Sequence, residues 1–510
     1  MKIFVKYACA ALFFLFTSCG NNKEYWHALP QQSAAIASID FPHLADRAGL
    51  NGKNGEYGLQ RLKDMVKSGL EGSGQLVDRV FKDATESGID FNNKLYVFLG
   101  EDNAYLGCLA KVSSSSKLEN VINSFTKEQI CQPIRETDGC NWTVLGKWLL
   151  AYSDDALLLL ADNKWSDPSK LVRQASMWLR QEESQSFASN TDFPQLQNTQ
   201  SDITLWTSLQ LLPRKVISPL TMGVSAELDL KKIKAITTVN FEAGKTVVDV
   251  TPLVTDHIVR QLSDKKMQSM SQIKGNHLDL FPAKTAFWTT ANIKGQKFYQ
   301  FLREIPSIQK FFDYSDLPIT LDYSRLFDAI DGDVSFAITD PRHKEFIFYA
   351  DVKQTEFLNF FTDLRPMIEK TNGMLLLEER GKDAFCFATR NGSVMNLLPG
   401  IKIFWFGVKD GRFYFTNNEK LIDQHVLGLS LRNKEWGKHV PGMNYFAVTD
   451  WTSLRAFEYL LQKDFLKGVP DIVPSYINDI LIESADGQQL RCTIEHKDKK
   501  QNLIQLLFQL

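Results

Sequence analysis

The sequence predicts an α+β protein made of two tandem, homologous units of antiparallel sheet backed by helices. Candidate strands come in adjacent pairs joined by short turns, as is typical of antiparallel sheets. The long, regular alternation of strands and helices that indicates a parallel doubly wound sheet is missing. The same series of landmarks also occurs twice along the chain, at a spacing of about 240–255 residues, which indicates an internal duplication.

The bulk composition bounds the number of domains and the classes of partner. A chain of 510 residues is too long for one core and fits two to four domains. The 44% hydrophobic and 23% charged residues are typical of a folded protein. A net charge of −2 creates no global field for nucleic acid, so we expect no nucleic-acid partner. The 35 Phe residues are expected mainly in core and sheet packing, with a ligand-binding aromatic surface as the alternative.

Residues 1–18 have the proportions of a signal peptide. Lys2 and Lys6 give the leader its positive charge, and an apolar run of ten residues follows, Tyr7 to Phe16. Ten helical residues rise only about 15 Å, half of a bilayer core, so the run is too short to span a membrane. Cys19 then begins a polar stretch, and we interpret residues 19–27 as a tether.

The sequence around Cys19 resembles the lipobox of bacterial lipoproteins, although Phe16 stands where Leu is usual. The resemblance implies that Cys19 is acylated and becomes the first residue of the mature protein. Burial of several acyl chains would make the anchor effectively permanent. The alternative is an ordinary secretory peptide with an incidental Cys. No later stretch approaches 18 uninterrupted apolar residues.

The duplicated units are expected at residues 28–262 and 278–510, with residues 263–277 as a linker or a polar connecting helix. Each unit opens with an apolar residue and a proline, Pro30 or Pro282, followed by a strand that ends in Asp or Asn. A proline suits this position because it cannot donate to a sheet ladder.

The next landmarks are strands and a helix that occur in the same order in both units. The strand Leu95 to Leu99 corresponds to Val334 to Ile338, and Tyr105 to Val112 corresponds to Glu345 to Val352. An amphipathic helical stretch follows in each unit. Its apolar residues are Leu118, Val121, Ile122 and Phe125 in the first unit and Phe357, Leu358, Phe361 and Leu364 in the second. The β-α-β-β-α order at the start of each unit is compatible with ferredoxin-like elements.

Hairpins and a tetrapeptide complete the correspondence. Residues 151–163 align without a gap on 406–418, each as a strand, a turn and a strand. Trp-Thr-Ser-Leu starts at both Trp206 and Trp451, which suits residues that pack in the fold, with an interface anchor as the alternative. Closing hairpins turn at residues 243–245 and 486–488. The alternative to duplication is one long mixed fold with recurring hairpins.

The cysteines leave one pairing open. Cys131 and Cys140 lie nine residues apart around Pro133 and Gly139, so they could close a disulfide loop in an oxidising compartment. The alternative is two buried thiols. There is no C-x-x-C and no clustering of Cys with His, so we expect no zinc or redox motif.

A search for catalytic motifs identifies no reaction. G-x-S-x-G, H-E-x-x-H, the P-loop and G-x-G-x-x-G are all missing from the sequence, so no catalytic residue, metal or cofactor is predicted. Asp331-Gly332-Asp333 could suggest calcium, but it lacks the Glu of an EF-hand loop and is interpreted as a turn at a sheet edge. Tyr25 and Trp26 could either contact the membrane surface or cap the first sheet.

The lipobox, the opening from Leu29 to Asp40 and the layout in two units resemble a family of large lipoproteins of unknown function from Bacteroides-type bacteria. The resemblance implies a membrane-anchored protein of the cell envelope, on the outer membrane, periplasmic or surface side. The favoured hypothesis is non-catalytic binding or scaffolding of a protein or glycan partner. The alternatives are a hydrolase-type enzyme with its site at the interface of the two units, and a structural spacer or chaperone-like lipoprotein.

Overall fold

The structure is a computed structural model, and it describes most of the chain after the leader. The chain divides into two compact units, residues 1–206 with 508–510, and residues 207–507. Paired antiparallel strands dominate, with helices between them, which confirms the predicted α+β class. The described residues are 24–50, 60, 63–64, 78, 83–101, 105–162, 168–211, 230, 232–305, 308–309, 312, 323–390, 401–422, 426, 428–451, 453 and 476–508.

The strands of the first unit alternate buried and more exposed residues, and several of its helices are capped by a side chain. In β1, Ala34, Ile36 and Ser38 are buried while their neighbours are more exposed, the period-two pattern of a strand. The elements of this unit are η1 (Tyr25–Ala28), β1 (Ser33–Ile39), α2 (Phe41–Arg47), η2 (Ala84–Ser87), β2 (Leu95–Gly100), β3 (Tyr105–Lys111), α5 (Ser115–Lys127), β4 (Arg135–Thr137), β5 (Cys140–Leu145), β6 (Trp148–Tyr152), β7 (Ala156–Asp162), α6 (Pro168–Arg180), η4 (Glu183–Gln185), η5 (Phe187–Ser189), α7 (Phe193–Asn198) and β8 (Ile203–Ser208).

Helices α5 and α6 bury one face each. The Ser114 side chain caps α5 by accepting a hydrogen bond from the Lys117 N–H, and Leu118 and Ile122 are buried on its inner face. Trp178 of α6 packs edge-on against Phe98 of β2, with ring centroids 5.7 Å apart. The amphipathic helix that the sequence predicts after Val112 is therefore confirmed as α5.

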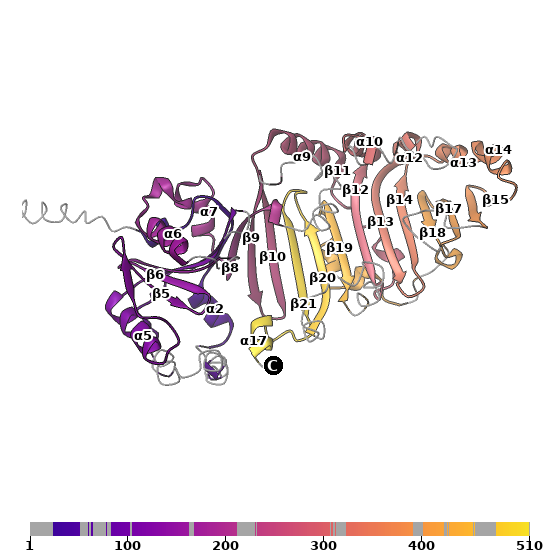
Figure 1. Cartoon of the computed structure of the whole chain (residues 1–510). Helices are drawn as coiled ribbons and strands as arrows, with labels where there is room; N and C mark the ends of the chain where they lie inside the picture. Colours follow the sequence, from indigo (N-terminus) through magenta and orange to yellow (C-terminus); the bar gives the residue numbers. More distant parts are fainter. Residues whose placement is uncertain are drawn as a thin grey trace, which may run out of the picture. The chain divides into compact units, whose positions relative to one another are not determined.

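The second unit holds the larger sheet. Figure 1 shows α9, α10, α12, α13 and α14 in a row at one end of its strands. The elements are η6 (Leu209–Leu211), β9 (Ile233–Glu242), β10 (Lys245–Val254), α9 (His257–Ser269), β11 (Met270–Ser271), η8 (Leu278–Leu280), β12 (Phe287–Lys294), α10 (Gly295–Arg303), α12 (Tyr323–Ala329), β13 (Ile330–Asp340), β14 (Glu345–Val352), η9 (Glu356–Leu358), α13 (Asn359–Asp363), α14 (Arg365–Glu369), β15 (Leu375–Gly381), β16 (Ala384–Thr389), β17 (Ile403–Lys409), β18 (Arg412–Thr416), η10 (Glu419–Leu421), η11 (Leu431–Asn433), η12 (Trp436–Lys438), β19 (Tyr445–Asp450), β20 (Ile477–Ser484), β21 (Leu490–His496) and α17 (Leu503–Phe508).

The order of paired strands is the same in both units. In the first unit it is β4-β5-β6-β7-β3-β2-β1-β8. In the second unit it is β15-β16-β17-β18-β14-β13-β12-β19. The order of their β-elements along the chain also matches, so each strand of one series has a counterpart in the other.

Strands β9 and β10 explain why the first compact unit ends near residue 206. The sheet of the second unit continues from β19 to β20 and β21, and then to β10 and β9, all antiparallel. These two strands thus lie in the second compact unit, although the sequence places them in the first repeat. Residues 263–277, the expected linker, begin with the end of α9 and continue into the short strand β11, which pairs with β12.

Phenylalanine packs on both faces of the sheet of the second unit. Phe385 and Phe406 stack with ring centroids 5.4 Å apart, and Phe404 and Phe415 stack at 4.8 Å. Trp288 packs with Phe446 in a core cluster that includes Ala337 and Ile347. The Phe excess therefore serves sheet packing in this unit, as the composition predicts.

Of two local expectations for the second unit, one is confirmed and the other is wrong. The helical stretch expected across residues 357–364 is present as η9 followed directly by α13, and α14 then begins with Pro366 in its first turn. Residues 331–333 are not a turn at a sheet edge but part of strand β13, where Asp333 is fully buried.

Within the described residues, no helix is long and apolar enough to cross a membrane.

Candidate functional site

The predicted anchor lies outside the described residues, which begin at residue 24. Neither the leader 1–18 nor Cys19 can therefore be placed. The last part of the expected tether is folded: Tyr25 is 4% exposed, and its hydroxyl donates to the Lys94 carbonyl at 2.7 Å. Of the two roles considered for Tyr25, packing against the first sheet is the one found, because its ring also contacts Tyr96.

Pro30 and Pro282 occupy matching positions in their units. Each forms an isolated antiparallel bridge to a serine, Ser186 for Pro30 and Ser430 for Pro282. The carbonyl of each proline also accepts a hydrogen bond from the hydroxyl three residues later, at 2.9 Å from Ser33 and 2.7 Å from Thr285. The two prolines thus make the same local structure.

Trp206 is the fourth residue of β8, whereas Trp451 directly follows β19, and both side chains are buried, at 3% and 8% exposure. Trp206 Nε1 donates to Asp192 Oδ2 at 2.9 Å. Trp451 Nε1 is buried without a hydrogen-bond partner among the described residues. Both side chains pack inside the fold, so neither is exposed as an interface anchor.

Cys131 and Cys140 are free thiols, and the proposed disulfide is not formed. The Gln132 N–H donates to the Val144 carbonyl at 3.0 Å, so Cys131 lies beside the far end of β5. Cys140 begins β5, four residues or about 13 Å along the strand from Val144. A disulfide requires Cα atoms within about 7 Å, so this geometry keeps the thiols apart.

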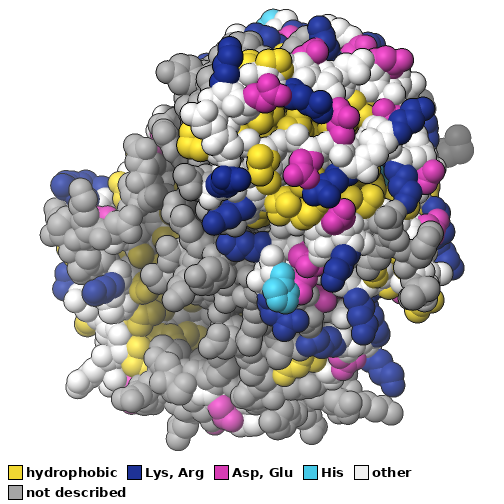
Figure 2. All heavy atoms as spheres, turned by 90° about the vertical axis from the view of Figure 1, so that its right-hand side faces the viewer, with side chains coloured by type: hydrophobic (Ala, Val, Ile, Leu, Met, Phe, Trp, Pro, Cys, Tyr) yellow, Lys and Arg dark blue, Asp and Glu magenta, His cyan; other side chains and the backbone are white. Residues whose placement is uncertain are grey.

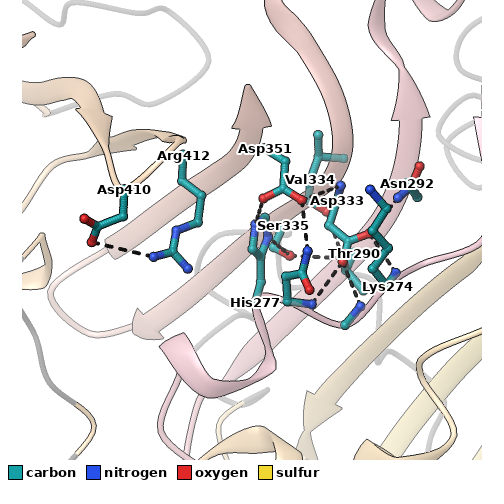
Figure 3. Close-up of polar contacts among 12 residues, drawn as sticks. Lys274, His277, Thr290, Asn292, Asp333, Val334, Ser335, Asp351, Asp410 and Arg412 are labelled. Atoms are coloured by element: carbon teal, nitrogen blue, oxygen red, sulfur yellow. Dashed lines mark hydrogen bonds and ion pairs between the residues drawn. The ribbon is translucent and has the colours of Figure 1, made fainter. Parts of the chain in front are cut away.

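A polar cluster of the second unit surrounds Asp333 on β13 (Figure 3). Asp333 Oδ1 accepts from Lys274 N–H at 2.9 Å and Asn292 Nδ2 at 2.8 Å. Its Oδ2 accepts from the N–H groups of Gly275 and Asn276, at 2.7 and 3.1 Å. Gly275 has φ +80°, the left-handed conformation that lets successive N–H groups converge on one carboxylate. Asp333 therefore fixes the chain between β11 and η8.

A second chain of hydrogen bonds runs beside Asp333. Thr290 Oγ1 donates to the Val334 carbonyl at 2.9 Å, and Ser335 Oγ donates to Thr290 Oγ1 at 3.0 Å. His277 Nδ1 lies 2.9 Å from Ser335 Oγ, and its Nε2 lies 3.0 Å from Asp351 Oδ1. Because the Ser335 proton points to Thr290, Ser335 accepts from His277. Both ring nitrogens of His277 are thus within hydrogen-bonding distance of a partner.

Asp351 is the partly exposed end of this network, with its side chain 20% exposed. Burial raises the pKa of Asp351, but the hydrogen bond and charge of His277 and the hydrogen bonds from Asp333 N–H and Asn276 outweigh it. The net pKa lies below the ordinary value. Arg412, which faces Asp351 on the neighbouring strand β18, lies 3.8 Å from Asp410 (Figure 3).

The hydrogen-bonded series Ser335–His277–Asp351 contains the residue types of a hydrolase catalytic triad, but it is not arranged to work as one. A nucleophilic serine must donate its proton to histidine and reach the substrate. Here Ser335 is 2% exposed and donates away from His277, to Thr290. The cluster therefore acts as a buried framework that joins the segment 274–277 to β13 and β14.

Sequence reasoning did not identify this cluster. Its members are spread over residues 274–351, and only the fold brings them together. One signal was present in the sequence. Asp333, Ser335 and Ala337 occupy alternate positions of one strand and so share one face, and Ala337 belongs to an apolar core cluster on that face. An Asp on that side would have to be buried and fully hydrogen-bonded.

Strand β15, the outermost strand of the sheet in the second unit, carries charged residues that oppose pairing with another chain. In the described part of the chain β15 pairs only with β16, and Leu376 on it is 36% exposed. Glu378 pairs with Arg380 at 2.6 Å and Glu379 with Arg365 at 2.7 Å. Figure 2, which faces this end of the molecule, shows acidic and basic side chains interspersed with hydrophobic ones. Charges of this kind oppose edge-to-edge aggregation.

Comparisons with known proteins give a family and distant structures. Residues 25–440 match the family described as "Domain of unknown function (DUF4836)". No curated protein sequence matches the chain. Solved structures of TP0453 match weakly: crystal form I has a TM-score of 0.27 at 8% identity and covers 48% of this chain and 86% of that chain. Crystal form III has a TM-score of 0.26 at 10% identity, with coverages of 49% and 88%.

Proposed function

The chain belongs to the DUF4836 family, and from this premise we propose that it is a lipoprotein of the cell envelope that binds or scaffolds a protein or glycan without catalysis. In this proposal Cys19 carries the acyl anchor, and the rest of the chain is held at the membrane surface by it. The anchored chain is placed by this proposal at the outer membrane of the envelope, on its periplasmic or its surface side.

The proposal includes an internal duplication, in which residues 278–510 repeat residues 28–262, with ferredoxin-like elements at the start of each copy. Support comes from the matching strand orders and from the matched bridges of Pro30 and Pro282. Eight strands in one order have few ways to arise twice by chance. A fold used twice presents two similar surfaces, which suits a protein that holds a repeated or extended partner.

One observation carries the non-catalytic part of the proposal: the direction of the Ser335 hydrogen bond. Ser335 donates to Thr290 and is sealed from solvent, so His277 serves the fold and not a nucleophile. Asp333 is saturated by four donors and has no acceptor position facing a substrate. The hydrogen-bonding groups of this cluster are thus occupied by contacts within the fold.

The test uses the full mature chain, purified in detergent with its anchor. A glycan array and photo-crosslinking in intact cells should identify a partner whose binding is saturable, and the partner should remain chemically unchanged. A Cys19→Ser chain, which cannot be acylated, should bind the same partner in solution but lose it from the membrane fraction. A blank array together with no saturable crosslink would reject the binding role, and turnover of the partner would favour the hydrolase alternative.

A further inference from the structure

A small cavity of the second unit contains charges that its own fold leaves unpaired. The cavity has a volume of about 280 Å³ and is lined by Pro282, Lys284, Thr285, Thr339, Glu345 and Leu421. This is close to the lower end of the range of roughly 300–1,000 Å³ that is usual for small-molecule sites. Its walls combine apolar surface from Pro282 and Leu421 with two hydroxyls and two opposite charges.

The two charges face one cavity but do not pair with each other. Lys284 is exposed and Glu345 is half-buried, and neither forms an ion pair with any residue in the described ranges. Asn418 Nδ2 donates to Glu345 Oε1 at 2.8 Å and holds this carboxylate in place, which leaves Oε2 for a ligand. A positioned anion and an unpaired cation around one cavity are complementary to a molecule that carries both charges.

The corresponding positions of the first unit show which of these residues the fold requires. Pro282 and Thr285 have counterparts in Pro30 and Ser33, with the same hydrogen bond between hydroxyl and carbonyl. Lys284 and Glu345, in contrast, correspond to Gln32 and Tyr105, which are neutral. The fold thus forms without the charges, and their presence in the second unit calls for a separate explanation.

We propose that this cavity binds a small zwitterion, with its anionic group at Lys284 and its ammonium group at Glu345. Thr285 Oγ1 already donates to the Pro282 carbonyl, so it can accept a further hydrogen bond from the ligand ammonium. Two molecular sources share this chemistry, a free α-amino acid and a phosphoethanolamine headgroup. The site is separate from the partner-binding role proposed above, so either can fail alone.

The test is a calorimetric titration of the full mature chain with L-alanine and with O-phosphoethanolamine, each up to about 10 mM, where a Kd in the millimolar range is detectable. N-acetylalanine and alaninamide each lack one charge, and each should bind at least about tenfold more weakly, as expected for the loss of one charge-assisted contact. The better of the two zwitterions identifies the source.

Two variants assign the charges, and a third is the control. Lys284→Met should abolish the preference for alanine over alaninamide, and Glu345→Gln should abolish the preference over N-acetylalanine. Gln32→Met, at the corresponding position of the first unit, should bind like the unmodified chain. Circular dichroism confirms that each variant is folded. The proposal is overturned if neither zwitterion binds, if glucose or a single-charge analogue binds equally well, or if both charge variants bind like the control.

Discussion

Replacing Asp333 by Asn tests the role of the buried polar cluster most sharply. The side chain keeps its size and loses its charge and one acceptor oxygen. Asp333 Oδ1 and Oδ2 each accept two hydrogen bonds, from four different donors. The single oxygen of Asn can serve one of these pairs, and its NH₂ group then faces two N–H donors that have no acceptor.

The expected cost follows from this count of donors. Each buried N–H left without an acceptor costs about 1–3 kcal/mol, so two of them cost about 2–6 kcal/mol. The cost falls on the segment 274–276, which the carboxylate holds against β13. Asp331→Asn is the matched control, because Asp331 lies two residues earlier on the same strand and is exposed. Its effect should stay within about 0.5 kcal/mol.

Hydrogen exchange read by mass spectrometry measures this cost locally, which matters because a chain of two compact units need not unfold in one step. In Asp333→Asn, the peptides that contain residues 274–276 should exchange roughly 30-fold faster or more, since 1.4 kcal/mol corresponds to a factor of ten. Urea unfolding should show a lower midpoint for the same variant. If Asp333→Asn and Asp331→Asn exchange alike, Asp333 does not hold this segment and the reasoning is refuted.

Four further substitutions probe other sites. Asp351 has a pKa below its ordinary value in the folded chain, so its stabilisation is present above about pH 4 and is lost as pH falls through the folded pKa. Asp351→Asn should therefore flatten the decline of Tm with acid, and a decline as steep as before would contradict this. Burial, with Glu495 and Asp450 nearby, raises the pKa of Asp479 despite Lys434, so ionisation there lowers stability once pH rises past the unfolded value of about 3.9. Asp479→Asn should raise Tm at neutral pH and not at pH 3, as scanning calorimetry can show. Trp206→Phe removes a hydrogen bond to a carboxylate, so the free energy of unfolding should fall by about 1.5–3 kcal/mol beyond the loss caused by the smaller ring. Trp451→Phe removes a buried donor that has no described partner, so its free energy of unfolding should fall by less. Equal losses in chemical denaturation would show that the indole N–H of Trp206 contributes nothing.

Local sequence patterns predicted the strands and hairpins well. The expected strand Glu345 to Val352 coincides with β14, and the hairpin aligned at residues 406–418 is β17 and β18. Alternation and turn residues encode such elements within a few positions of each other, so a short window contains the information. The order of landmarks along the chain likewise needs no knowledge of the fold.

Features that depend on contacts between distant residues were not predictable in this way. The expected turn at Asp331-Gly332-Asp333 is a strand, because the carboxylate of Asp333 finds four donors that lie up to 59 residues away in sequence. The position of β10 beside β21 likewise joins residues 245 and 495. The loop between Cys131 and Cys140 suggested a disulfide by spacing alone, whereas the hydrogen bond from Gln132 to Val144 places Cys131 at the other end of β5 from Cys140.

The most direct test of the proposed envelope lipoprotein is the intact mass of its N-terminal peptide, measured on protein extracted from its native membrane. The account predicts a chain that begins at Cys19 and carries fatty acyl groups on that residue. A peptide that still contains residues 1–18, or an unmodified Cys19, would contradict the anchor and with it the proposed place of this protein in the cell.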